Sequence, residues 1–384
     1  MTQHISGRRN ELDWLRVLAF ILLIFYHIGM FYVEGWDWHV KSQYQSDWLQ
    51  FPMILVNQWR MPLIFFVSGS VLALVETKIG RLRLLRVRFL RVFVPLVIGM
   101  YLVVPPQLYF QAIQSEGLGL NYWDFLLEYW NPLTHILPSH RHSDLGLLTW
   151  NHLWYLAYLW HYTLLYLLLR SPLQALSAKL ANIKVSRLTL FLLPTVLLTA
   201  YGLFLKPYFP RTHGLTDDWY NHALSFTVFI FGYLAAKSPS LWQAIVQGRR
   251  AWLLMAMTCY TCLMVINMTT WFEIGDTWLI STVVQLIVYA NVSAWLLTVV
   301  GFATYYLNRE HKVLTYLNEA ILPWYIFHQT ITIVIAMQLS KLSLGGLLES
   351  TLLILGTFLG CAILYDITRR FKVTRFMFGM KLVS

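Results

Sequence analysis

Charged residues are scarce in this chain of 384 residues. Asp, Glu, Lys and Arg make up 12% of it, whereas hydrophobic residues make up 58% and aromatic residues 16%. Soluble domains usually contain about 45–50% apolar and about 25% charged residues, so this composition excludes an ordinary soluble domain. The formal net charge is +11, and its meaning depends on which loops carry the basic residues.

Cysteine is also scarce, with only Cys259, Cys262 and Cys361 in the chain. The stretch CYTC (259–262) has the spacing of a redox or metal-binding motif. It lies in an apolar segment, however, where no further cysteine or nearby histidine completes a site. We interpret these cysteines as packing residues and expect no bound metal.

The sequence lacks a recognisable cleavable leader, a fused soluble domain, a low-complexity tail and a clear internal repeat. Its first hydrophobic segment contains an arginine, is longer than a signal-peptide core and is not followed by a small-x-small cleavage pattern. We therefore expect residues 1–384 to form one membrane domain whose N-terminal segment is retained.

Long apolar runs are what the chain has instead. A helix that crosses a bilayer needs about 20 mostly apolar residues. Ten windows meet this requirement: 12–33, 51–76, 92–113, 150–170, 187–206, 219–237, 251–269, 278–307, 314–340 and 346–368. The sequence therefore predicts an all-α integral membrane protein, a bundle of about ten transmembrane helices.

The basic residues are distributed unevenly between the predicted loops. Of the 29 Lys and Arg residues, 22 precede the first span or follow an even-numbered span, and only five lie on the other side. By the positive-inside rule both termini are then cytoplasmic, which requires an even number of spans. Topology thus explains the excess positive charge, and we expect no nucleic-acid partner.

The first predicted span, LDWLRVLAFILLIFYHIGMFYV (12–33), carries Asp13, Arg16 and His27. Eleven residues separate Arg16 from His27, which places them on one helix face and roughly 16 Å apart along the axis. Arg16 then lies near the cytoplasmic surface and His27 near the middle of the membrane. Such side chains usually face an interior cavity and have a function. The alternative is that Arg16 snorkels and His27 bonds a neighbouring helix.

This polar stripe indicates a specific chemistry. A guanidinium suits a phosphate or carboxylate, and a neutral imidazole suits a general base. Arg16, His27 and the substrate-contact candidate Asp13 therefore predict a phosphate-bearing cytoplasmic donor whose reactive end reaches the middle of the membrane. Glu319, near the cytoplasmic end of the ninth span, is a candidate ion-pair partner for Arg16.

At these residues the chain resembles the acyltransferase-3 superfamily of ten-span membrane enzymes. The first match is Arg16, ten intervening residues and His27. Four further segments support it: WRMPLIFFVSGSVLAL (59–74), RLLRVRFLRVFVPL (83–96), NHLWYL (151–156) and ILPWYIFHQT (321–330). Within the superfamily the chain is most similar to the glucan biosynthesis protein C group, through WDWHV (36–40) and LYDITRRFKVTRFMFGMK (364–381).

The resemblance implies transfer of an acyl group, succinyl in the glucan group, from cytoplasmic acyl-CoA to hydroxyls of an extracytoplasmic glucan. It places the protein in the bacterial inner membrane, with acyl-CoA as a co-substrate and no tightly bound cofactor. The thioester would arrive near His27, which would deprotonate the acceptor hydroxyl. An acyl-histidine intermediate and a homodimer are left open.

Several basic residues precede or enter the third span. Anchoring by the positive-inside rule, or attraction to anionic lipid, explains most of them. Arg88 and Arg91 are three residues apart, so we expect them close together on one helix face. Because a guanidinium binds phosphate oxygens in pairs, Arg86, Arg88 and Arg91 are also candidates for the phosphates of coenzyme A.

Two polar residues lie deep in the second span. Arg60 precedes Pro62, whose missing N–H frees backbone carbonyls that the guanidinium could satisfy. The other interpretation is that Arg60 binds the carboxylate of a dicarboxylic acyl chain or the developing oxyanion. Ser68, in FFVSGS, is read first as a small residue that allows close helix approach, with a serine nucleophile as the alternative.

The remaining candidates are histidines and their aromatic neighbours. His328 lies about 14 residues into the ninth span, at a depth like that of His27. The two histidines are either the base and its partner, or one of them only lines the acceptor cavity. The candidate contacts to the acceptor lie towards the outer face or beside His328: His39, His152, Trp154 and Tyr325.

Two other classes of protein compete with the enzyme. A multispan transporter or flippase for an anionic or acylated substrate would also bury charges. Transporters usually show related halves and paired helix interruptions, and the sequence shows neither. A purely structural subunit gives no reason for two histidines in the middle of the membrane.

Overall fold

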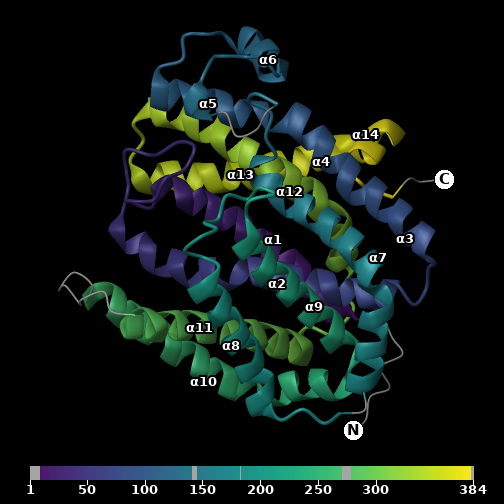
Figure 1. Ribbon diagram of the computed structural model, residues 1–384. Helices are drawn as coiled ribbons and strands as arrows, with labels where there is room; N and C mark the ends of the chain where they lie inside the picture. Colours follow the sequence, from purple (N-terminus) through teal and green to yellow (C-terminus); the bar gives the residue numbers. More distant parts are fainter. Residues whose placement is uncertain (1–8, 141–144, 182, 270–277, 382–384) are drawn as a thin grey trace. The chain divides into compact units, whose positions relative to one another are not determined.

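The structure is a computed structural model that describes residues 9–140, 145–181, 183–269 and 278–381. Within these ranges the chain is helical, with short 3₁₀ and π turns and no β-strand (Figure 1). The helices in chain order are α1 (Asn10–Tyr32), α2 (Gln50–Val75), α3 (Arg81–Arg88), α4 (Val94–Ile98), α5 (Pro105–Glu116), α6 (Tyr122–Trp130), α7 (Trp154–Ala181), α8 (Arg187–Phe204), α9 (Trp219–Lys237), α10 (Pro239–Thr269), α11 (Trp278–Tyr306), α12 (Lys312–Leu339), α13 (Gly346–Thr368) and α14 (Lys372–Met377).

A helix occupies each of the ten predicted windows. Among the described residues, eight helical segments are long and apolar enough to cross a membrane: Asn10–Tyr32, Asp47–Val75, Arg81–Glu116, Arg187–Phe204, Pro239–Met268, Trp278–Tyr306, Lys312–Leu342 and Gly346–Thr368. Helices α7 and α9 occupy the other two windows, and tyrosine, tryptophan and histidine residues lower their hydropathy. The prediction of an all-α protein with several membrane-spanning helices is confirmed.

The third segment, Arg81–Glu116, is not a regular helix. It contains two π-helical turns, Phe89–Phe93 and Gly99–Val103. Pro95 and Pro105 follow these turns at the starts of α4 and α5. A proline lacks the N–H of the helical ladder, and its ring crowds the carbonyl four residues earlier, so the ladder widens there.

The π turn also changes the expected arrangement of three arginines. Arg86 and Arg88 lie on α3 and Arg91 lies in the first π turn, so all three are helical. A π turn has more residues per turn than an α-helix. Arg88 and Arg91 therefore lie farther apart around the axis than the α-helical spacing predicted. Arg86 and Arg91 are exposed, and Arg88 is half-buried.

The chain forms two compact units. The first contains the residues up to Ala19 with Ile54–Leu84 and Leu164–Thr315. The second contains Phe20–Met53, Leu85–Thr163 and the residues from Tyr316 onward. Five helices therefore contribute residues to both units: α1, α2, α3, α7 and α12.

In the first unit, α8, α10 and α11 run side by side (Figure 1). Helices α2 and α9 approach each other at glycines. An added Cβ at Gly69 would lie 1.8 Å from the carbonyl oxygen of Phe229, and one at Gly232 would lie 2.0 Å from that of Phe66. The Ser70 hydroxyl donates to the carbonyl of Gly232 at 3.0 Å. The small residues of FFVSGS thus let these two backbones meet.

In the second unit, α6 packs on α5 and covers carbonyls that the prolines free. Pro105 leaves the carbonyl of Tyr101 without its helical donor, and the indole N–H of Trp130 donates to this oxygen at 3.1 Å. The Tyr129 hydroxyl donates to the carbonyl of Met100 at 3.0 Å. Helix α5 can therefore start at a break without exposing unsatisfied backbone to an apolar surrounding.

Candidate active site

Helices α1 and α12 bring two histidines of the second unit together, although 301 positions separate them in the chain. Nδ1 of His27 lies 2.8 Å from Nε2 of His328. The rings are stacked, with centroids 5.0 Å apart and planes 8° from parallel. His328 is fully buried and His27 is half-buried. The pair is therefore shielded on one side and accessible on the other.

The hydrogen bonds decide which ring nitrogens carry protons. Nδ1 of His328 lies 2.7 Å from the carbonyl oxygen of Tyr325. A carbonyl only accepts, so this Nδ1 is protonated and Nε2 of the neutral ring is an acceptor. Nδ1–H of His27 must then donate to His328. Nε2 of the neutral His27 ring is left with the lone pair, which is the form of a general base.

A third histidine continues the polar interior. Nε2 of His152 lies 3.0 Å from the carbonyl of Ile326 and therefore donates to it. Its Nδ1 accepts from the amide nitrogen of Gln107 at 3.2 Å. The same amide nitrogen donates to the hydroxyl of Thr330 at 2.7 Å. The ring of His152 stands edge-on to that of His328, with centroids 5.3 Å apart.

Gln329 joins this interior to the first external loop. Its amide nitrogen donates to the side-chain oxygen of Gln107 and to Nε2 of His39, at 2.9 Å in each case. Nδ1 of His39 donates to the side-chain oxygen of Gln111 in a short hydrogen bond. Like His152, His39 therefore has one donating and one accepting nitrogen, as a neutral ring requires.

The loop that carries His39 is held on α1 and α5. The Lys41 ammonium donates to the carbonyls of Met30 and Val33 at the end of α1, where a cation is favourable. Burial lowers the pKa of Lys41, and nearby Asp37 partly opposes this effect. The Lys41 backbone N–H donates to the side chain of Gln114 at 2.8 Å, and the Gln114 amide donates back at 3.1 Å.

The broken helix before α5 explains why Gln107 reaches the cluster. Pro105 occupies the start of α5, so Gln107 lies in its first turn. The carbonyl of Val103, left outside the regular ladder, accepts from the hydroxyl of Thr330 at 2.5 Å. At the break in the helix, this hydrogen bond therefore connects the third segment to α12 close to the histidines.

The other predicted acceptor contacts lie beside the cluster. Tyr325 is buried, and its hydroxyl donates to the carbonyl of His152 at 2.6 Å. Its ring lies 6.0 Å from that of His328. Trp154 is half-buried and lies edge-on to Tyr158, one helical turn away.

The sequence interpretation did not single out four residues of this network: Gln107, Gln111, Gln329 and Thr330. Two signals were available. Gln107 and Gln111 are four residues apart in an apolar stretch and so share a helix face. Gln329 and Thr330 directly follow His328 in ILPWYIFHQT.

The other predicted site residues near the start of the chain and in α2 belong to the first unit. A nitrogen of Arg16 lies 4.0 Å from a carboxylate oxygen of Asp13, one turn earlier on α1. Arg60 is buried in α2, with 6% of its surface exposed. Ser68 is half-buried in the same helix.

Glu319 has a partner that the sequence interpretation did not name. In the second unit its carboxylate accepts from Arg375 of α14 at 2.5 Å. Arg375 also donates to the carbonyls of Arg369 and Lys381, at 3.1 and 2.7 Å. The short C-terminal helix, which the sequence interpretation did not identify, thus provides the guanidinium next to Glu319.

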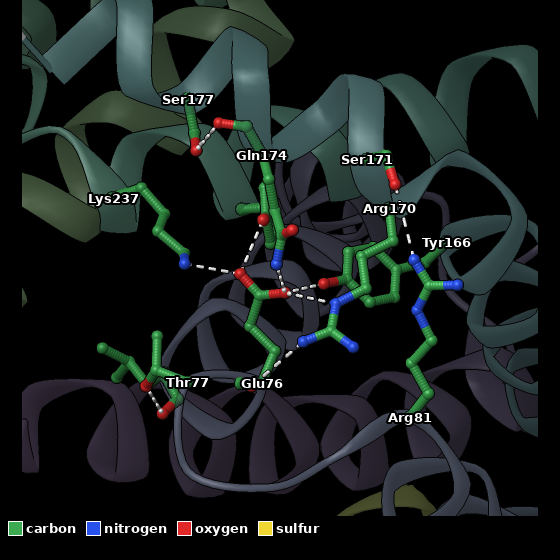
Figure 2. A network of polar contacts seen from close by, with 11 residues as sticks. Glu76, Thr77, Arg81, Tyr166, Arg170, Ser171, Gln174, Ser177 and Lys237 are labelled. Carbon is green, nitrogen blue, oxygen red and sulfur yellow. Dashed lines mark hydrogen bonds and ion pairs between the residues drawn. The ribbon is translucent and has the colours of Figure 1, made fainter.

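The first unit contains a polar cluster of another kind, centred on buried Glu76 at the end of α2 (Figure 2). The Tyr233 hydroxyl and the Lys237 ammonium lie 2.6 and 2.5 Å from one carboxylate oxygen. The other oxygen accepts a short hydrogen bond from Tyr166 and a 3.1 Å bond from Gln174. Nε of Arg170 lies 3.6 Å from this second oxygen. Both oxygens of the carboxylate are therefore occupied.

The described residues contain no group of three or more His, Cys, Asp or Glu side chains arranged to hold a metal ion. The polar interior of the second unit is built instead from imidazoles, amides and hydroxyls whose proton positions are defined. A hydrogen-bonded pair of imidazoles, one buried and one accessible, is suited to proton transfer. Fold and site together define an integral membrane protein with the groups for acid–base catalysis.

Comparison with known proteins identifies the family. A family model described as an acyltransferase domain matches residues 9–366, so the chain belongs to this acyltransferase-3 family. The glucans biosynthesis protein C of Salmonella heidelberg (strain SL476) and that of Salmonella agona (strain SL483) are similar to it. Each is 24% identical over 390 residues, which cover 98% of this chain and 96% of the relative. No solved structure matches the chain. The resemblance inferred from the sequence motifs is confirmed, and acyl transfer is the class of reaction.

Proposed function

We propose that the protein transfers an acyl group, succinyl in the first instance, from cytoplasmic acyl-CoA to hydroxyls of an extracytoplasmic glucan in the bacterial inner membrane. The family supports acyl transfer, and the printed names of the relatives support a glucan as the acceptor. Ten spans with both termini in the cytoplasm complete the proposal. They are supported by the distribution of the basic residues and by helices in all ten windows, with α7 and α9 as the less apolar pair.

The observation that carries this proposal is the chain of bonds from His27 through His328 to the carbonyl of Tyr325. It leaves the lone pair of His27 on Nε2. That nitrogen takes the proton of the acceptor hydroxyl while the hydroxyl oxygen attacks the thioester carbonyl. The C–S bond then breaks, and the proton returns from His27 to the thiolate of coenzyme A. No acyl-enzyme is needed.

Cationic residues are assigned to the donor. The exposed Arg86 and Arg91 and the half-buried Arg88 provide guanidinium groups suited to phosphate oxygens. Arg16, with Asp13 beside it, receives the anionic part of the donor nearer the thioester. Buried Arg60 suits the free carboxylate of a succinyl group or the oxyanion that forms during attack.

Polar groups near the outer end of the cluster are assigned to the acceptor. His39, Gln111 and Gln329 carry an imidazole and amides that can exchange their mutual hydrogen bonds for bonds to the hydroxyls of a sugar. His152, whose ring nitrogens are both bonded within the protein, contributes by holding Gln107. Trp154 provides an aromatic face on which a sugar ring can stack. These groups would orient a hydroxyl towards His27 without charging the interior.

The test is acyl transfer by the purified full-length protein in proteoliposomes, with succinyl-CoA and a glucan, and with products identified by mass spectrometry. Wild-type protein should yield succinylated glucan, and His27→Ala should lose transfer by about 10²–10⁴-fold while remaining folded. His161→Ala, a half-buried histidine of α7 outside the cluster, is the matched control and should keep activity. Glucan or lipid that crosses the bilayer without covalent change would identify a transporter instead.

A further inference from the structure

The first unit contains a polar pocket of about 270 Å³ where the loop before α12 meets the start of α1. None of the roles assigned above involves it. Its lining residues are Asn10, Glu310, His311, Lys312, Leu314 and Thr315. The positive-inside topology proposed above places the loop between α11 and α12, and hence this pocket, on the cytoplasmic side.

One wall of the pocket is an oriented imidazole. Nδ1 of His311 accepts the backbone N–H of Val313 at 3.3 Å. Nε2 of the neutral ring is therefore protonated and available as a donor. The indole of Trp14 lies beside this ring, with centroids 6.1 Å apart and planes 59° from parallel. The imidazole of His311 lines the pocket, with the Trp14 ring as its neighbour, and offers a flat surface on which a nucleobase can stack.

A second wall contains a buried amide. Asn10 is only 7% exposed, lines the pocket, and makes no side-chain hydrogen bond with any residue of the described part of the chain. Buried amides are normally satisfied by a partner. A carboxamide has a donor and an acceptor side by side, which matches the edge of an adenine base. The Asn10 side chain therefore indicates a ligand with a complementary polar edge.

The remaining groups suit a ribose and its phosphates. Lys312 is exposed at the first turn of α12, a helix of 28 residues, so its ammonium and the helix dipole attract an anion at the same place. Glu310 provides a carboxylate that can accept from a ribose hydroxyl. The pocket thus combines recognition of a base, a sugar and a phosphate.

We propose that this pocket binds the adenine nucleotide end of the acyl donor. The base pairs with the Asn10 amide beside the His311 ring, the ribose hydroxyl bonds to Glu310, and the ribose phosphate meets Lys312. This inference rests on the proposed function for the identity of the donor. Arg16 lies six residues beyond Asn10 on α1, roughly 9 Å along the axis. It therefore follows the pocket in the direction of His27.

The test measures binding of adenosine 3′,5′-bisphosphate to the full-length protein in nanodiscs, by calorimetry and by quenching of tryptophan fluorescence. Lys312→Gln and Asn10→Leu should each weaken binding by about tenfold or more, and Lys312→Arg should retain it. Lys372→Gln, which removes an exposed lysine of α14, is the matched control and should bind like the wild type. Because Lys312 is exposed, its variant tests the pocket even where Asn10→Leu fails to fold.

The outcomes separate the pocket from the proposed function. Equal binding by the wild type and both pocket variants would overturn the pocket assignment and leave acyl transfer unaffected. Competition by inorganic phosphate as strong as that by the bisphosphate would reduce the pocket to a simple anion site and also overturn the assignment. Variant-sensitive nucleotide binding by a protein that transfers no acyl group would support the pocket and reject the proposed reaction.

Discussion

The two units each contain a buried polar cluster, and the two clusters are built on opposite principles. In the second unit, His27, His39, His152 and His328 are linked through amides and backbone carbonyls, and the hydrogen bonds are satisfied with every ring neutral. In the first unit, one carboxylate at Glu76 is surrounded by Lys237, Arg170, Gln174 and two tyrosine hydroxyls (Figure 2). One cluster avoids charge, and the other concentrates it.

Whether a cluster is neutral or charged decides whether it is suited to proton transfer or to stabilising the fold. A neutral imidazole can gain and lose a proton at modest cost because both of its forms exist near neutral pH. A buried carboxylate with two cations and three neutral donors around it has no such freedom, since removing any partner leaves uncompensated charge in a low dielectric. We therefore expect the histidine cluster to tolerate substitution structurally but to lose activity, and the Glu76 cluster to do the reverse.

The largest expected effect on activity after loss of the base itself comes from His328. In His328→Leu the acceptor that orients His27 Nδ1–H is missing, so the His27 ring loses its defined tautomer, and turnover should fall by about 10²-fold or more. His328→Gln offers a side-chain oxygen to the same N–H and should recover part of the rate.

The measurement is the pH dependence of kcat for both variants and the wild type. A residue that orients the base changes kcat and the pH profile, whereas a residue that only fills space changes thermal stability. Equal activity of the leucine and glutamine variants would contradict the positioning role.

The largest expected effect on stability comes from Glu76. Glu76→Gln removes the carboxylate that Lys237 and Arg170 contact, and should lower the free energy of unfolding by about 3–5 kcal/mol. The measurement is thermal unfolding in detergent, and activity per folded molecule should change little. Glu34→Gln, an exposed carboxylate, is the control.

A double-mutant cycle sharpens this prediction. Removal of the Lys237 charge together with the Glu76 charge relieves the repulsion that the single Glu76 variant creates. Glu76→Gln combined with Lys237→Gln should therefore destabilise the protein less than the sum of the single changes. Strict additivity would show that the ion pair contributes nothing.

An intermediate effect is expected from Gln329, which connects His39 to Gln107. Gln329→Leu leaves an imidazole nitrogen and an amide oxygen without their donor. We expect each unsatisfied group to cost about 1–3 kcal/mol of free energy. Because the bonds that hold His27 are separate from these, the KM for the glucan should rise more than kcat falls. Gln338→Leu is the control, because it removes an exposed glutamine near the C-terminal end of the same helix, α12. A fall in kcat alone would contradict an acceptor-positioning role.

The apolar runs in the sequence were sufficient to predict where the helices lie, but not where they are irregular. The window 346–368 coincides with α13 and 219–237 with α9, because apolar runs between polar loops leave little choice. The π turns before Pro95 and Pro105 were not predicted, since a proline in an apolar run indicates a break but not how the ladder rearranges around it.

The candidate site was predictable to the extent that its chemistry lies in rare residues. His27 and His328 stood out as polar residues in long apolar runs, and the prediction that they lie at a similar depth followed from the helical rise. Gln107 and Glu76 did not stand out, because their roles depend on tertiary partners more than 40 positions away. Single-sequence reasoning identifies which residues are unusual, and the fold decides which of them meet.

The smallest expected effect concerns the ion pair between Glu319 and Arg375. This pair is charged like the Glu76 cluster, but it is partly exposed to solvent. Its carboxylate side chain is 40% exposed, so water screens the attraction, and Glu319→Gln should cost about 1 kcal/mol or less. Arg375 is 10% exposed and donates to two backbone carbonyls as well, so Arg375→Met should cost more than Glu319→Gln. Thermal unfolding at low and high salt checks both statements, because only the carboxylate contribution should fall with ionic strength. An effect of Glu319→Gln as large as that of Glu76→Gln would show that burial does not decide the strength of these ion pairs, and the contrast between the exposed pair and the buried cluster would fail.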